Sequence, residues 1–180
     1  LLWKLAGIEA LALMQAAEGT AYLPNNGPAM TVLLDKGAKV DAQDKRGRTA
    51  LYRAAAEGKD EAVRLLLAHK SDLNKKADDG TTPVLETVIF GKMSTLKIWL
   101  ENGAKADVPD AQGNTALMIA AEGNAYMPNN APLVIALLEK GVKVDAQDSS
   151  GRTPLYRAAT EGKTEAAALL LDKKANANQK

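Results

Sequence analysis

Four short segments of the sequence share one pattern: glycine, a polar residue, threonine, alanine or proline, and an aliphatic residue. They begin at Gly47, Gly80, Gly113 and Gly151. The first two spacings are 33 residues and the third is 38 residues. A fixed period of this size is typical of a chain built from one repeated supersecondary unit, in which each unit covers the apolar face of its neighbour.

Each period predicts a turn followed by two short helices. In the unit that begins at Gly47, Thr49 stands where it can cap a first helix, and Gly58 can end that helix in the left-handed conformation. A second helix is predicted over residues 60–69, "DEAVRLLLAH", whose apolar side chains gather on one face. Since neither helix can bury its apolar face alone, we expect an all-α solenoid of stacked helix-turn-helix units with short hairpin turns.

The pattern resembles the ankyrin-repeat family. Matching features are Gly-x-Thr-Pro/Ala-Leu at the unit starts, "AAAEGK" at the end of a first helix, "LLL" in a second helix and "NGAKAD" or "KGVKVD" at the unit ends. The resemblance covers about residues 9–180. The family usually has histidine after the leucine, and this chain has other residues there: Tyr52, Leu85, Met118 and Tyr156. The resemblance implies that a partner protein docks on a concave face made by the turn tips and the first helices.

We expect one domain over residues 1–180, divided into five units. They are an irregular N-terminal cap with a loop insertion (1–46), two plain repeats (47–79 and 80–112), a repeat with a loop insertion (113–150) and a C-terminal repeat (151–180). In unit one, Glu9 and Leu11 stand where the later units have the turn glycine and the capping threonine. Either the first helix continues back toward Trp3, or a preceding turn is absent from the sequence.

The two halves of the chain match at an offset of 104 residues. Residues 9–76 and 113–180 are identical at 42 of 68 positions, which indicates a three-unit duplication or deliberate design. The inserted loops, 19–28 and 123–132, match at 7 of 10 positions, about the background level. Residues 39–55 and 143–159 match better, at 14 of 17 positions.

Within the better-matched stretch, an Arg–Tyr–Arg set returns although units three and four carry other residues. The set is Arg48, Tyr52 and Arg53 in unit two, and Arg152, Tyr156 and Arg157 in unit five. Arginine and tyrosine are frequent anchors of protein interfaces, so we predict that they bind a partner. In the alternative interpretation, the tyrosines are core residues and the arginines pair with Asp44 and Asp148.

The inserted loops hold four further candidate partner-binding residues, Tyr22, Asn25, Tyr126 and Asn129. The alternative is that these loops are structural filler, because lengthening a loop costs only about 0.6 kcal/mol per doubling. Asn129 or Asn130 can also cap the helix that follows.

Composition excludes several kinds of chemistry. The net charge is +1, which gives no reason to expect a nucleic-acid partner. There is no cysteine and only one histidine, His69, so we expect no catalytic set, no metal site and no cofactor. The aspartates in "DAQDKRG" and "DVPDAQG" lack the spacing of a calcium loop and fit turns in which aspartate accepts backbone N–H bonds.

The start of the chain, "LLWKLAGIEALALM", is too short and too interrupted for a membrane span and lacks the features of a signal peptide. Because the sequence does not start with methionine, we expect a fragment, and the compartment stays open with the cytoplasm as the default. We expect a monomeric, non-enzymatic scaffold that binds a protein or peptide, with acidic partners favoured by the arginines. The alternatives are a targeting or autoinhibitory part of a larger enzyme, and an engineered scaffold.

Overall fold

The computed structural model describes residues 2–19, 26–124 and 130–179, and of residues 2–7 the backbone alone. Within these residues there are ten helices and no strand, which confirms the predicted all-α fold. The helices are α1 (Leu2–Glu18), α2 (Gly27–Asp35), α3 (Ala50–Glu57), α4 (Asp60–Ala68), α5 (Pro83–Ile89), α6 (Met93–Glu101), α7 (Ala116–Glu122), α8 (Ala131–Glu139), α9 (Pro154–Thr160) and α10 (Thr164–Asp172).

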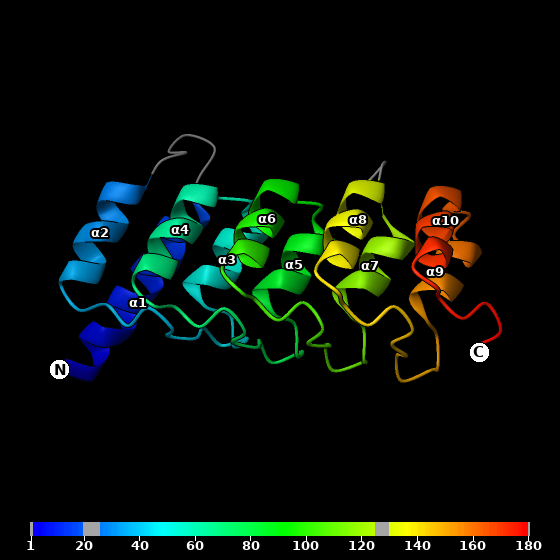
Figure 1. Cartoon of the computed structure of the whole chain (residues 1–180). Helices are drawn as coiled ribbons and strands as arrows, with labels where there is room; N and C mark the ends of the chain where they lie inside the picture. The colour runs from blue at the N-terminus through cyan, green and yellow to red at the C-terminus, as the bar shows by residue number, and fades with distance from the viewer. Residues whose placement is uncertain (1, 20–25, 125–129, 180) are drawn as a thin grey trace.

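The helices form a row of five pairs in two layers (Figure 1). The first helices of the units, α1, α3, α5, α7 and α9, each pack against the next first helix along the row. The second helices, α2, α4, α6, α8 and α10, do the same in the other layer. The two ends of the chain therefore lie at opposite ends of the row, with the turns along one edge (Figure 1).

A threonine begins each of the four first helices that follow a turn. The hydroxyl of Thr49 accepts a hydrogen bond from the backbone N–H of Tyr52 at 3.1 Å, and Thr82, Thr115 and Thr153 do the same three residues on. Gly58 ends α3 with φ 67°, in the left-handed region. Both local predictions for this unit are confirmed, because each depends on residues within one helical turn.

Each turn crosses a unit boundary and is named for the unit whose first helix follows it, so residues 41–48 form the turn of unit two, 107–114 that of unit four and 145–152 that of unit five. Adjacent turns are joined edge to edge by one backbone hydrogen bond each, and we call this series the turn ladder. Its N–H donors and carbonyl acceptors are Asp78 to Arg46 (3.0 Å), Ala111 to Asp79 (3.1 Å) and Ser149 to Gln112 (3.0 Å). The turns approach so closely that a Cβ on Gly47 would lie 2.8 Å from the backbone nitrogen of Asp78. Together with its φ of 71°, this contact explains why glycine begins unit two, and Gly80 and Gly113 make the same close approach to the next turn.

One large residue at the same place in each of the last four second helices fills the core. These fully buried residues are Leu66, Trp99, Leu137 and Leu170. Trp99 alone brings a polar group, and its indole N–H donates to the hydroxyl of Thr87 at 2.7 Å. The other units have alanine at the Thr87 position, so unit three replaces an alanine–leucine pair with a threonine–tryptophan pair.

Unit one differs from the others because α1 continues through the positions where the other units turn. The helix begins at Leu2, as the alternative that extends it toward Trp3 predicts. Ala10 and Leu11 lie in this helix at the places of Asn114 and Thr115 in unit four. Unit one therefore contributes no turn to the turn ladder.

The prediction that the Asn130 side chain caps the second helix is wrong. Asn130 precedes α8, but its side chain makes no bond to that helix's N–H groups. Its amide instead donates to the carbonyls of Ala120 (2.7 Å) and Ala121 (3.1 Å), at the end of α7. Asn129, the other predicted cap, lies outside the described residues.

Candidate protein-binding face

Two arginines converge on the carboxylate of Asp44 in the turn of unit two. Arg48 lies 2.9 Å from Asp44 Oδ2, and Arg53 donates to the same oxygen at 2.9 Å. The other end of the Arg53 guanidinium donates to Glu18 of α1 at 2.6 Å. We call these four residues the first ion cluster, and they connect unit two to unit one.

Unit five repeats the arrangement around Asp148. Arg152 and Arg157 contact Asp148 Oδ2 at 2.7 Å and 2.6 Å, and Arg157 also donates to Glu122 at 2.7 Å. Arg157 has one acceptor more than Arg53, the side-chain oxygen of Asn114. We call this set the second ion cluster, and it connects unit five to unit four.

The alternative in which the arginines pair with Asp44 and Asp148 is confirmed. Arg53 and Arg157 lie largely inside the array, with side chains that are only 14% and 8% exposed. Arg48 and Arg152 remain 31% and 49% exposed. Each cluster therefore has an inner arginine that bridges two units and an outer arginine with an accessible guanidinium.

The aspartates at the centre of the clusters are held in their charged form. Burial would raise the pKa of Asp148, but hydrogen bonds from Arg157, Arg152 and the Ser150 backbone outweigh it and place the pKa well below its usual range. Asp44 has a lowered pKa for the same reasons, with the N–H groups of Arg48 and Arg46 contributing most. The predicted turns in which aspartate accepts backbone N–H bonds are confirmed for Asp44 and Asp110. Asp148 accepts backbone N–H bonds in the same way.

The two tyrosines of the Arg–Tyr–Arg sets differ in exposure. Tyr52 is 6% exposed and fits the alternative in which it belongs to the core. Burial, and then its interaction with the Glu86 carboxylate, raises the pKa of Tyr52 far above its ordinary value. Tyr156 is 48% exposed on α9, so the core interpretation is wrong for this residue.

Three acidic residues of this face escaped the sequence analysis. Glu18 and Glu122 lie 35 residues before the arginines that they contact, and only the stacking of units brings them together. Glu86 is half-buried on α5, and burial raises its pKa. The repeat period itself was the available signal, because a residue near the end of one first helix lies beside the next first helix.

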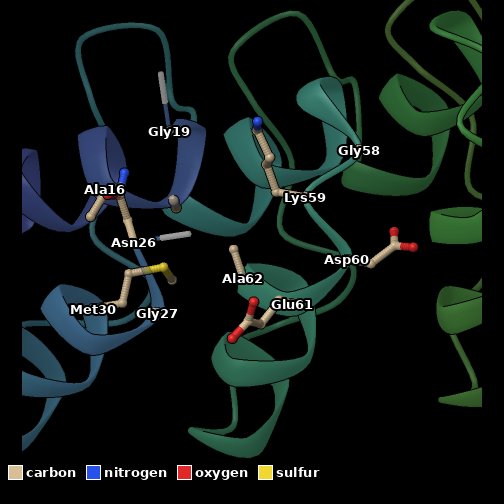
Figure 2. A pocket seen from close by; sticks show the side chains of 11 residues that line it. Ala16, Gly19, Asn26, Gly27, Met30, Gly58, Lys59, Asp60, Glu61 and Ala62 are labelled. Atoms are coloured by element: carbon tan, nitrogen blue, oxygen red, sulfur yellow. The ribbon is translucent and has the colours of Figure 1, made fainter. Parts of the chain in front are cut away.

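The loop candidates Tyr22, Asn25, Tyr126 and Asn129 lie outside the described residues. A small hollow of about 200 Å³ lies between α1, α2 and α4. Figure 2 shows that its Asp60 side chain turns away from Asn26 and Met30, and this carboxylate accepts a hydrogen bond from Thr95 of α6. In the described part of the chain no group of histidine or acidic side chains is arranged to hold a metal ion.

The two-layer stack, the threonine-capped first helices and the turn ladder agree with a comparison against known families. A model for ankyrin repeats in three copies matches residues 13–91 and 85–180. The chain belongs to the ankyrin-repeat family. Ankyrin repeats are protein–protein interaction modules, and they bind protein partners.

Curated relatives show where such ankyrin repeats occur. Similar proteins include nuclear factor NF-kappa-B p105 subunit from Gallus gallus, 32% identical over 163 residues, which are 88% of this chain and 16% of that protein. Ankyrin repeat domain-containing protein 63 from Homo sapiens is 34% identical over 94 residues, 50% of this chain and 25% of that protein. E3 ubiquitin-protein ligase KEG from Arabidopsis thaliana is 32% identical over 108 residues, 59% of this chain and 7% of that protein.

In each case the matched region spans a quarter or less of the relative's length. None of the helices in the described ranges has both the length and the apolar character that a membrane span requires.

Proposed function

We propose that this chain is a non-enzymatic scaffold that binds a protein or peptide on the face formed by its turns and first helices. We assign the contact to the two Arg–Tyr–Arg sets, with different roles for their members. Arg48, Arg152 and Tyr156 touch the partner, because their side chains are the accessible ones. Arg53, Arg157 and Tyr52 hold the face in shape.

The observation that carries this proposal is that the outer arginines are both anchored and accessible. Asp44 and Asp148 fix one edge of each guanidinium, and the remaining N–H groups are free to face solvent. An ordered side chain loses little conformational entropy when it binds, so preorganised arginines favour association. Guanidinium groups pair best with carboxylates, which favours an acidic partner.

The test compares two variants of the intact chain against a partner obtained by affinity capture and then purified. Arg48→Ala with Arg152→Ala should weaken binding about tenfold or more, because the two arginines are the proposed anchors. Arg64→Ala is the control, since it removes an exposed arginine from α4 in the other layer. Isothermal calorimetry gives the affinities, and circular dichroism establishes that each variant keeps its helices.

Binding that is unchanged in the double variant, or that falls equally in Arg64→Ala, contradicts the proposal. Alanine at Arg53 and Arg157 is unsuitable for this test. These arginines bridge units, so their loss would break the contacts between units, leave Asp44 and Asp148 with one cation fewer, and destabilise the array.

The inserted loops are a second proposed contribution, through Tyr22, Asn25, Tyr126 and Asn129. The sequence alone supports this contribution: both loops carry a tyrosine and an asparagine at matching places in the two halves.

A second candidate function is a targeting or autoinhibitory region of a larger enzyme. The observation that favours it is the similarity to E3 ubiquitin-protein ligase KEG, in which the matching region covers only 7% of the protein. The sequence that flanks this chain in its gene discriminates between the two functions. A neighbouring domain with a complete catalytic set would favour this second candidate.

A further inference from the structure

A groove of about 790 Å³ lies between α1 and the turn of unit two. Its α1 side is apolar and is formed by Ala10, Leu11 and Met14. Its other side is basic, with Lys39, Lys45 and Arg46 among the lining residues. We call it the α1–turn groove. It lies where the later units have a preceding turn and unit one has none.

The second half of the chain provides an internal reference for this groove. Residue numbers 104 higher give the corresponding place in unit five, where the turn of unit four, residues 107–114, occupies the equivalent space. Three hydrogen bonds hold that turn in place. They run from Lys143 N–H to the Asp107 carboxylate (3.0 Å), from Ser149 N–H to the Gln112 carbonyl (3.0 Å), and from Arg157 to the Asn114 side chain.

The donors that correspond to Lys143, Ser149 and Arg157, 104 residues earlier, are Lys39 N–H, Lys45 N–H and the Arg53 guanidinium. Among the described residues, neither Lys39 N–H nor Lys45 N–H has an acceptor. Arg53 contacts Asp44 and Glu18 but finds no third acceptor in the described part of the chain, because Ala10 stands where unit four has Asn114. The missing partners are all acceptors: a carboxylate, a carbonyl and an amide oxygen.

The α1–turn groove also carries positive charge that the corresponding place in the second half lacks. The turn that precedes unit five carries Ser149 and Ser150 at its tip, whereas the turn that precedes unit two carries Lys45 and Arg46. The groove therefore combines unfilled hydrogen-bond donors with two additional positive charges. Carboxylates are the acceptors that such a site binds most strongly, because charge-assisted hydrogen bonds are about twice as strong as neutral ones.

We propose that the α1–turn groove binds a short acidic peptide segment of a partner protein, in the way that residues 107–114 lie against the turn of unit five. One carboxylate of the segment accepts from Lys39 N–H, and a backbone carbonyl accepts from Lys45 N–H. A further acceptor reaches Arg53, while Lys45 and Arg46 attract the acidic side chains. This inference rests on the proposed scaffold function and assigns it a place and a partner chemistry.

The test uses the chain's own turn as the probe. The blocked octapeptide Asp-Val-Pro-Asp-Ala-Gln-Gly-Asn, the sequence of residues 107–114, is titrated into the ¹⁵N-labelled full chain and followed by NMR. We expect saturable shifts of the Lys39 and Lys45 backbone amides. A peptide with asparagine in place of both aspartates should bind about tenfold more weakly, a difference of about 1.4 kcal/mol.

Two variants separate the groove from its charge. Lys45→Ser with Arg46→Ser reproduces the unit five turn, so it should fold normally and lose about tenfold in peptide affinity. Ser149→Lys with Ser150→Arg adds the same charges at a turn whose corresponding place is already occupied by residues 107–114. This variant should create no peptide binding at that turn.

The proposal is overturned by the absence of saturable shifts at millimolar peptide, by equal binding of the neutral peptide, or by unchanged binding in the serine variant. These results are separable from a failure of the proposed function. A purified partner that depends on Arg152 but not on Lys45 and Arg46 would leave the scaffold function intact and remove the groove as its site.

Discussion

At the scale of single residues, the array shows how one large side chain requires a second substitution. Trp99 fills a place that holds leucine in units two, four and five, and its N–H is buried. Thr87, where those units have alanine, supplies the acceptor at 2.7 Å. A buried donor without a partner costs about 1–3 kcal/mol, so the two residues are coupled.

A double-mutant cycle tests this coupling. Thr87→Ala should lower the unfolding free energy by about 1–3 kcal/mol in the wild-type chain, because it leaves the Trp99 N–H unsatisfied. In a chain that carries Trp99→Leu, the same change should cost much less, since it recreates the alanine–leucine pair of the other units. Urea unfolding followed by circular dichroism measures both costs, and equal costs in the two backgrounds would show that no coupling exists.

The second residue-scale prediction concerns acid. The pKa of Asp148 is lowered in the folded chain, so near pH 4 the unfolded chain binds more protons and stability rises with pH. The contribution of Asp148 is complete above the ordinary aspartate pKa of about 3.9 and is lost progressively as the pH falls below it. Asp148→Asn should therefore lower the free energy of unfolding at pH 7 by about 3 kcal/mol, and that free energy should fall less steeply below pH 4 than in the wild-type chain.

Asp110→Asn is the matched control for this measurement. Asp110 has the same place in the turn of unit four and accepts the N–H groups of Gln112 and Asn114, but no arginine contacts it. The prediction fails if urea titrations from pH 2 to pH 7 give the same slope for wild-type chain and Asp148→Asn.

At the scale of elements, one amide side chain joins the end of a first helix to the start of a second. Asn130 is buried and donates to two carbonyls at the end of α7. The last carbonyls of a helix have no partner within it, so this bond replaces one that the helix cannot supply. Its counterpart Asn26 is half-buried and makes no side-chain bond to the start of α2.

The duplication therefore provides its own comparison. Asn130→Ala should lower the thermal stability by about 1–3 kcal/mol, because two buried carbonyls lose their donor. Asn26→Ala should change it by less than about 0.5 kcal/mol. Differential scanning calorimetry of both variants checks the difference, and similar effects at the two positions would argue against the role of Asn130.

The residues that sequence analysis predicted correctly are those whose partners lie nearby in the chain. Thr49 caps α3 and Asp44 accepts Arg48 because each contact spans three or four residues. The contact of Glu18 with Arg53, 35 residues apart, needed the stacked units, and that of Thr87 with Trp99, 12 residues apart, needed the pairing of α5 with α6 in unit three. The α1–turn groove was beyond sequence reasoning, because it appears only when the hydrogen bonds of the two halves are compared.

At the scale of the whole molecule, stability is distributed along a row in which each unit packs against its neighbours. A central unit is covered on both sides, whereas α10 packs mainly against α8 and α9 at the end of the row. Leu171 of α10 is consequently exposed, although its counterpart Leu67 of α4 is partly buried against the core.

Amide hydrogen exchange of the 180-residue chain should reveal this gradient. We expect amides of α10 to exchange faster than those of α6, because opening the last unit breaks one interface and opening a central unit breaks two. Mass spectrometry of peptic fragments measures both rates. Uniform protection along the row would show that the array opens only as a whole.

The Thr87 hydroxyl also restricts the order in which unit three can have acquired its distinctive pair. Besides accepting from Trp99, this hydroxyl donates to the Pro83 carbonyl at 2.8 Å, so a threonine is satisfied there even beside leucine. A tryptophan that arrived first, beside alanine, would have had no acceptor. Among histories made of single changes, the one that never leaves the tryptophan N–H without an acceptor places the threonine before the tryptophan.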